Sequence, residues 1–163
     1  MAAQIIMVQV SDPIWTAKAL HLAGALARGS DAQVALVHLI QVQHLSWLGT
    51  DMGYSLVRPE TRREIHEYEL TLEDYGVPYA KYVMQCADLT QGIVQAAEQI
   101  EAQIVFAHLP KSFIPYWTKL QWSALRRRLA RQNRTLMQAD VTLLDSSTTS
   151  LREPAELPFP TRP

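Results

Sequence analysis

Three polar side chains that could do chemistry stand at the ends of two apolar runs of the sequence. Ser11 and Asp12 follow the run from Ile5 to Val10, and His108 ends the run from Gln103 to His108. A hydroxyl, a carboxylate and a histidine that titrates near neutral pH could together line a polar pocket for a small ligand. The alternative is structural, with Ser11 and Asp12 capping the next helix and His108 satisfied by local hydrogen bonds.

Three further side chains, those of His38, Lys111 and Ser123, are candidates for the same pocket. His38 lies near the end of another apolar run, residues 34–40, and Lys111 follows His108 by three residues. A lysine near a strand end could hold an anionic group. A histidine inside an apolar run more commonly makes a local hydrogen bond than binds a ligand. We therefore favour a local hydrogen bond for His38 over ligand binding.

Recognisable catalytic and metal-binding motifs are absent from the sequence. The five histidines are far apart, and none forms an i, i+4 pair with a carboxylate. There is no G-x-S-x-G nucleophile motif. The single cysteine, Cys86, excludes an internal disulfide, and its place at the end of an apolar run predicts an inert packing residue. We therefore predict that the protein is not an enzyme and holds no metal.

Apolar runs of strand length alternate with amphipathic segments of helical period. The predicted strands are 5–10, 34–40, 79–85, 103–108 and 141–144, and the predicted helices are 13–29, 59–76, 88–100 and 118–138. Such alternation is typical of a parallel sheet with right-handed crossovers and helices on both faces. The fold class is therefore α/β, a three-layer doubly wound sandwich with a five-stranded parallel sheet. Its crevice is expected beyond the carboxyl ends of the strands, where Ser11, Asp12 and His108 would meet.

The length of 163 residues suits one domain, which we place at residues 1–145. Residues 146–163 carry four of the nine prolines and are predicted to form a tail that is neither helix nor central strand. The first ten residues lack the pattern of a signal peptide, and no apolar run approaches about 20 residues. A cytoplasmic location is the default expectation.

Positive charge is concentrated in one part of the chain. No acidic residue occurs between Glu101 and Asp140, although the whole chain has a net charge of -1. Arg127, Arg131 and Arg134 fall on one face of the predicted helix 118–138. They could be a solvated helix face, or they could bind an acidic protein, an anionic lipid headgroup or a phosphate. A pI of about 6.5 argues against specific nucleic-acid binding.

Four large apolar residues lie just before that helix, two of them on each side of Pro115. They are Phe113, Ile114, Tyr116 and Trp117. These side chains could fill the crevice of the sheet, which is the simpler interpretation, or project as a docking patch. The long irregular segment 41–58, which contains Trp47, is a second candidate partner surface.

The order and spacing of these segments resemble those of the universal stress protein family over residues 4–145. The matching stretches are Ile-Ile-Met-Val-Gln-Val, Gln-Val-Ala-Leu-Val-His-Leu, and Ala-Asp-Leu-Thr-Gln-Gly-Ile-Val-Gln-Ala-Ala-Glu with the later Ala-Gln-Ile-Val. The resemblance implies a Rossmann-like fold of the adenine-nucleotide alpha-hydrolase type. It also implies a homodimer that pairs through the exposed fifth strand, which is predicted at Val141, Thr142, Leu143 and Leu144.

Members of that family that bind ATP carry an acidic residue after the first strand and the pattern G-x-x-G-x9-G-S/T after the fourth. In this sequence Ser11 takes the acidic position, and the first two glycine positions fall on His108 and Lys111. The last pair falls near Gln121 and Trp122, or one residue later at Trp122 and Ser123, and no glycine follows Gly92. The resemblance therefore does not extend to the nucleotide loop, and we expect no ATP cofactor.

Three functional hypotheses remain. The leading one is a non-enzymatic regulatory or protein-binding module, a homodimer that acts through its unusual loops and tail. The second is a stress sensor that binds ATP or AMP, with the phosphates on Lys111 and Lys119 instead of glycine-loop amides. The third is an accessory subunit that docks on an anionic membrane through the arginine helix.

Overall fold

The structure is a computed structural model that describes residues 4–43, 46, 48–50, 58–111 and 113–139. The described chain alternates strand and helix, as the sequence predicts. In order, the elements are β1 (Ile5–Val10), α1 (Pro13–Ser30), β2 (Gln33–Gln41), α3 (Pro59–Tyr75), β3 (Tyr79–Cys86), α4 (Leu89–Gln99), β4 (Ile104–Phe106), α5 (Pro115–Arg131) and β5 (Thr135–Met137).

All five strands are parallel and lie in the order β3-β2-β1-β4-β5. The central strand β1 pairs Val10 with His38 of β2 on one side and Val8 with Phe106 of β4 on the other. Strands covered on both faces are expected to be largely apolar, as β1 is apart from Gln9 and β2 is apart from His38 and its terminal glutamines. The prediction of a five-stranded parallel sheet is confirmed.

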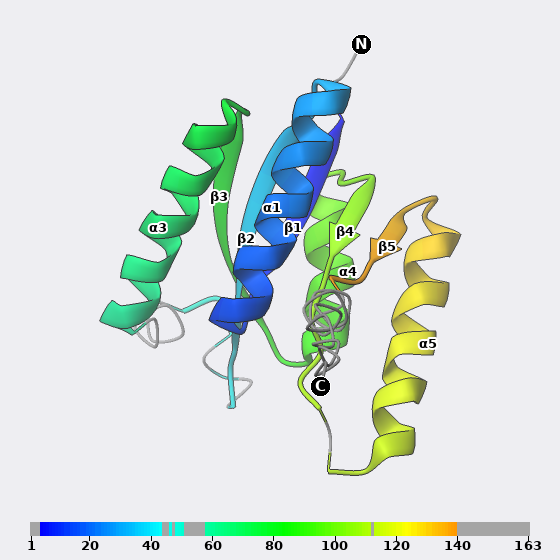
Figure 1. The fold of residues 1–163 in the computed structure, drawn as a ribbon. Helices are drawn as coiled ribbons and strands as arrows, with labels where there is room; N and C mark the ends of the chain where they lie inside the picture. Colours follow the sequence, from blue (N-terminus) through cyan, green and yellow to red (C-terminus); the bar gives the residue numbers. More distant parts are fainter. Residues whose placement is uncertain (1–3, 44–45, 47, 51–57, 112, 140–163) are drawn as a thin grey trace, which may run out of the picture.

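Helices cover both faces of the sheet and make a three-layer sandwich (Figure 1). Helices α1 and α3 pack on one face with Ile6 and Val8 of β1, which point to that side. Helices α4 and α5 pack on the other face, where Met7 of β1 and Val105 of β4 lie among their apolar side chains. The alternation of adjacent side chains on β1 therefore supplies two separate apolar cores.

Helix caps agree with the sequence at three ends and differ at one. Asp12 accepts a hydrogen bond from the backbone N–H of Trp15 at the start of α1, and Asp88 caps α4. Gly76 ends α3 with a φ of 67°. The prediction that Gly29 ends α1 is wrong, because the helix continues to Ser30 and Asp31 takes the left-handed conformation with a φ of 53°.

The last helix is shorter than predicted, and the fifth strand lies earlier. Asn133 takes a φ of 56°, and its N–H donates to the carbonyl of Ala130 while the N–H of Arg134 donates to that of Leu129. This pair of bonds is a Schellman motif, which ends α5 at Arg131. The prediction of a helix to Gln138 is therefore wrong, and the fifth strand is Thr135–Met137. The predicted strand Val141–Leu144 and the predicted tail lie outside the described residues.

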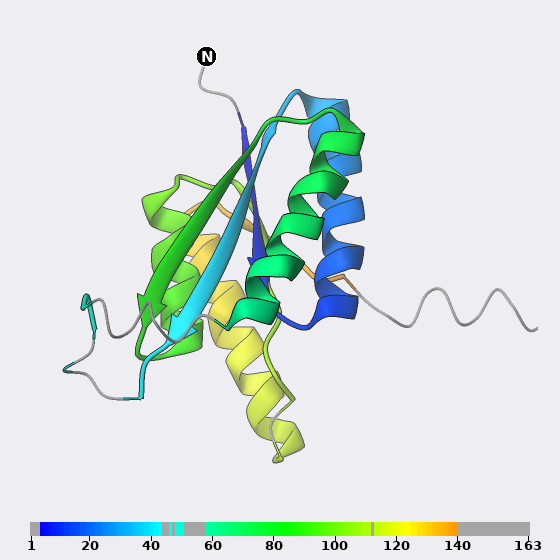
Figure 2. The ribbon, with the colours of Figure 1, turned by 90° about the vertical axis from the view of Figure 1, so that its left-hand side faces the viewer.

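Helix α5 also begins earlier than predicted, at Pro115. Its first turns extend beyond the carboxyl ends of the strands, as the lower end of α5 shows (Figures 1 and 2). Farther along, Leu125 and Leu129 are completely buried against the sheet. The second half of α5 is therefore held by the core, and the first half projects from it.

Candidate functional site

The switch point of the sheet lies between β1 and β4, because the chain builds outward from β1 in both directions. At their carboxyl ends, the Ser11 hydroxyl and Nδ1 of His108 are 3.0 Å apart. The backbone N–H of His108 donates to Oε1 of Gln9 over 2.9 Å, and the Trp15 ring lies 5.2 Å from the imidazole. The sheet thus brings Ser11 and His108 together, with the capping carboxylate of Asp12 beside them.

A cavity of about 450 Å³ opens at this edge of the sheet. We call it the switch-point cavity, and it is lined by Gln9, Val10, Ser11, Asp12, His38, Leu39, Gln41, Thr61, Glu64, Leu89, His108 and Pro110. Four of the predicted pocket residues line it together, namely Ser11, Asp12, His38 and His108. The two charged residues of the lining are both carboxylates, Asp12 and Glu64. Neither Lys111, which is exposed, nor Ser123 is part of this lining.

Burial affects both histidines of this cavity. It lowers the pKa of His108, an effect that the carboxylate of Asp12 opposes and the charge of Lys111 reinforces. Burial alone lowers the pKa of His38, whose Nδ1 is buried without a partner among the described residues. Both imidazoles are therefore predominantly neutral at pH 7, and the described lining of the cavity offers no cation to a phosphate.

Sequence reasoning missed several residues of this site. Gln9 is 2% exposed and holds the backbone of His108, while the hydroxyl of buried Thr16 accepts a hydrogen bond from the Ser11 N–H. Glu64 and Thr61 reach the cavity from α3. A polar residue within the apolar run Ile-Ile-Met-Val-Gln-Val was the available signal for Gln9. No local signal marks the α3 residues, because packing between helices places them.

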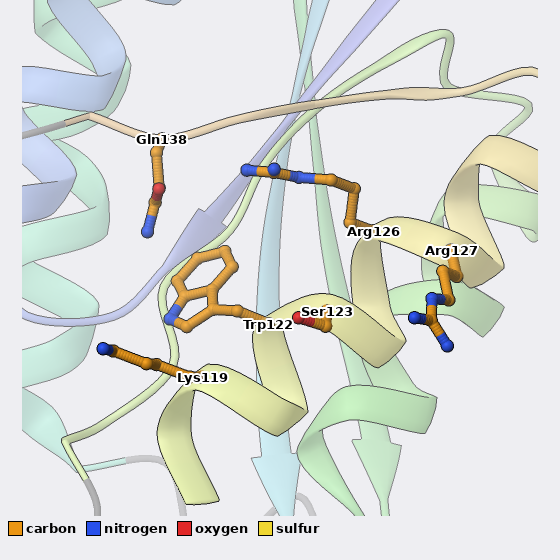
Figure 3. A pocket seen from close by; sticks show the side chains of 6 residues that line it. All are labelled: Lys119, Trp122, Ser123, Arg126, Arg127 and Gln138. Atoms are coloured by element: carbon orange, nitrogen blue, oxygen red, sulfur yellow. The ribbon is translucent and has the colours of Figure 1, made fainter. Parts of the chain in front are cut away.

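A second cavity, of about 500 Å³, lies beside α5. We call it the α5 cavity, and it is lined by Lys119, Trp122, Ser123, Arg126, Arg127 and Gln138. Figure 3 shows Lys119, Trp122 and Arg126 reaching toward the side of the helix where Gln138 lies, while the Arg127 side chain points away. Ser123, which was predicted in the same pocket as Ser11, belongs to this cavity instead.

The aromatic segment before and within the first turns of α5 is exposed to solvent. The exposed fractions are 104% for Phe113, 58% for Ile114, 80% for Tyr116, 55% for Trp117 and 65% for Leu120. The interpretation that these residues fill the crevice is therefore wrong. Because α5 begins at Pro115 and projects past the sheet, its first turns have no core to pack on. We call these five residues the aromatic surface.

The arginines that were predicted as one row separate in the structure. Arg127 and Arg131 are exposed on α5, as expected. Arg134 instead lies half-buried in the turn after the helix, where its guanidinium donates to the carbonyl of Ala102 and to Oε1 of Gln132. It is a structural residue of that turn because α5 has already ended. Trp47, the other predicted partner residue, lies outside the described part of the chain.

Other kinds of site were searched for in the described residues. No group of three or more histidine, cysteine, aspartate or glutamate side chains there is arranged to hold a metal ion. None of the described helices is long and apolar enough to cross a membrane.

Solved structures share the fold of this chain over most of its length. A universal stress protein family structure from Burkholderia pseudomallei superposes with a TM-score of 0.59 and 18% identity, over 83% of this chain and 94% of that one. The chain has the universal stress protein fold. The universal stress protein UspA from Lactobacillus plantarum gives a TM-score of 0.59 at 11% identity, over 85% and 99% of the two chains.

A third universal stress protein, crystallised in complex with cAMP, gives a TM-score of 0.57 at 13% identity, over 85% of this chain and 97% of that one. No protein-family model matches the sequence, and no curated protein matches it. The superpositions establish the universal stress protein fold. Because the identities are low, the ligand has to be argued from the residues of this chain.

Within that fold, the region after β4 differs from the nucleotide loop that the sequence resemblance describes. The positions of its last glycine-Ser/Thr pair fall on Gln121 and Trp122, or on Trp122 and Ser123, and all of these residues lie well inside α5. Backbone N–H groups in a helix interior donate to carbonyls four residues earlier. At these positions they are therefore not free to bind phosphate.

Proposed function

We propose that this chain is a non-enzymatic regulatory module that has the universal stress protein fold, binds a protein partner and does not bind ATP. The observation that carries the proposal is the early start of α5 at Pro115. Because α5 begins early, continuous helix takes the place of a phosphate-binding loop. The same early start projects the aromatic surface into solvent. One change in the course of the chain thus supports both parts of the proposal.

The lack of ATP binding is supported by the charges at the switch point. Among the described residues, the lining of the switch-point cavity has carboxylates from Asp12 and Glu64 and no lysine or arginine. A triphosphate there would face like charges at short range, which disfavours binding. Burial keeps His38 and His108 from supplying a compensating positive charge at pH 7.

Protein binding is supported by the composition and shape of the aromatic surface. Tryptophan and tyrosine are enriched at the centres of protein interfaces, where they fill pockets on the partner. Phe113 lies just before α5, Tyr116 and Trp117 lie in its first turn, and Lys119 is exposed soon after them. We expect a partner with an apolar groove and acidic residues at its rim.

Thermal unfolding with and without ATP, AMP or cAMP, each at millimolar concentration with magnesium, tests the first part. A ligand at about 100 times its dissociation constant would add about 2.7 kcal/mol, which is several degrees for a domain of this size. We expect no shift that depends on the adenine ring. A shift with AMP or cAMP would overturn the proposal, because those ligands carry little phosphate charge.

Capture of partners by tagged protein tests the second part. The double variant Phe113→Ser/Trp117→Ser removes the aromatic surface, and Ile14→Ser, which changes a residue 66% exposed on α1, is its matched control. We expect the same proteins to be retained by the parent and the control and lost with the double variant. Retention by all three forms would show that the surface does not bind them.

We further propose that the module is a homodimer that pairs through β5. This strand is at one end of the described sheet, so one edge has no described strand beside it. Light scattering after gel filtration should give twice the monomer mass. Met137→Lys, at a residue 37% exposed on the edge strand, should shift the protein toward monomer because a charge on an edge disfavours pairing. An unchanged dimer would place the interface elsewhere.

A second candidate function is an adenine-nucleotide sensor in the cytoplasm. It is favoured by the presence of a cavity at the switch point and by the cAMP complex of a protein with the same fold. On this candidate, Lys111→Glu should abolish a nucleotide-dependent shift in unfolding temperature. Docking on an anionic membrane would instead appear as salt-sensitive binding to acidic vesicles.

A further inference from the structure

We infer that the α5 cavity is a binding site for a compact oligophosphate, a ligand of the pyrophosphate class. The cavity is lined by six residues on α5 and on the segment after β5, and the cationic side chains of Lys119 and Arg126 reach toward Gln138 (Figure 3). It is separate from the switch-point cavity, and its lining shares no residue with it. The inference goes beyond the proposed function, because it assigns a ligand that needs no adenine recognition.

Among the residues that the structure describes, no carboxylate lines this cavity. No acidic residue occurs in the sequence between Glu101 and Asp140. Neither Lys119, Arg126 nor Arg127 forms an ion pair with any carboxylate that the structure describes. Cations that lack internal partners are available to an anion from solution, and their mutual repulsion falls when one binds.

The lining residues of α5 follow one helical stripe. Lys119, Trp122, Ser123 and Arg126 have the spacing i, i+3, i+4 and i+7, which brings their side chains to one side of the helix. The two cations are therefore at the ends of the stripe, about 10 Å apart along the helix axis at 1.5 Å per residue. Long flexible side chains from both ends can converge on two linked phosphate groups more readily than on one small ion.

The remaining side chains supply hydrogen bonds and a wall. The hydroxyl of Ser123 and the side-chain amide of Gln138 can donate to phosphate oxygens, and arginine can do so with two parallel bonds. The half-buried indole of Trp122 packs against the core and forms one wall of the cavity, while Lys119, Ser123 and Arg126 are exposed to solvent.

Isothermal titration with inorganic pyrophosphate, and separately with tripolyphosphate, tests this site. The double variant Lys119→Ala/Arg126→Ala removes the cations at both ends of the stripe. Arg128→Ala is the matched control, because Arg128 is exposed on the same helix and does not line the cavity. We expect the double variant to weaken binding by about tenfold or more, and the control to change it by less than about twofold.

Three results would overturn the inference: no heat or shift in unfolding temperature with millimolar pyrophosphate, parent-like binding by the double variant, or equal weakening by the control. The last would indicate a diffuse charge effect of the helix. Circular dichroism of each variant, and unfolding temperatures without ligand, establish that a loss of binding is not a loss of folding.

A comparison of ATP with tripolyphosphate separates this site from the switch-point cavity. If both raise the unfolding temperature equally and the double variant abolishes both effects, the α5 site stands, and the proposed absence of ATP binding holds for the switch-point cavity alone. If ATP binds more tightly and His108→Gln weakens it, adenine is recognised and the proposed function fails. If neither ligand binds, the inference fails while the proposed function stands.

Discussion

The Ser11 hydroxyl and Nδ1 of His108 lie 3.0 Å apart, although 97 residues separate them in the sequence. Each residue follows the carboxyl end of one of two neighbouring parallel strands, so the pairing of β1 with β4 determines their distance. Gln9 holds the His108 backbone from the same strand end. The contact between Ser11 and His108 therefore depends on the correct pairing of β1 with β4, and it does not require a bound ligand.

The free energy of unfolding should fall as the pH is lowered from about 8 to about 5. Burial lowers the pKa of both His38 and His108 in the folded protein. As the pH falls through the ordinary histidine pKa of about 6.5 toward the lower folded values, the unfolded chain takes up protons that the folded protein resists. The contribution of His38 and His108 to the free energy of unfolding is thus complete above the unfolded pKa. It is lost as the pH falls from there through the lower pKa values of the folded protein.

Urea unfolding of the parent and of His38→Gln/His108→Gln, measured at intervals across this range, checks the prediction. The double variant should lose less stability than the parent as the pH falls, and values near pH 8 provide the reference for each protein. Equal losses in the two proteins would contradict it.

Gly92 of α4 should not tolerate alanine. A Cβ at this position would lie 2.6 Å from Cβ and 2.8 Å from Sγ of Cys86, closer than packed atoms approach. We expect Gly92→Ala to destabilise the protein by about 1–3 kcal/mol through overpacking. Gly29→Ala on α1 is the control, because nothing lies within 4 Å of its Cβ position, and it should stabilise by about 0.5 kcal/mol. Denaturant unfolding of both variants measures the contrast, which would be absent if α4 packed differently.

Two leucines on α5 should differ greatly in their contribution to stability. Leu125 is completely buried against the sheet, and Leu120 is 65% exposed. Leu125→Ala should cost about 2–5 kcal/mol, because it removes buried methyl groups and leaves a cavity. Leu120→Ala should change the free energy of unfolding by less than about 0.5 kcal/mol. Similar effects of the two substitutions in chemical denaturation would mean that α5 sits on the sheet in another rotation.

Cys86 should react slowly with thiol reagents in the folded protein. The side chain is 4% exposed, and burial raises the pKa of its thiol, with a smaller contribution from the charge of Asp88. The reactive thiolate is therefore scarce and shielded at neutral pH. Labelling with a chromogenic disulfide should be much slower than in urea, where the same single cysteine serves as its own control. Rapid stoichiometric labelling of the native protein would contradict the structure.

The sequence alone determined the fold class and most helix starts. Alternating apolar runs and amphipathic segments are local patterns, and each strand buried on both faces must be apolar along its length. The caps Asp12 and Asp88 and the end of α3 at Gly76 are likewise short-range features that their own segments specify. The end of α5 was missed because Leu129 and Leu136, seven residues apart, also fit a helix, and the left-handed Asn133 decides otherwise.

Only the tertiary structure decided what these elements present to a ligand or partner. The sequence left open whether Phe113 and Trp117 fill the crevice or project, because burial depends on where α5 meets the sheet and not on residue type. It also placed Ser123 with Ser11, whereas the position of Ser123 inside α5 puts its side chain in a different cavity. Contacts between distant segments depend on how helices pack on the sheet. Local patterns encode each segment but not the distances between them.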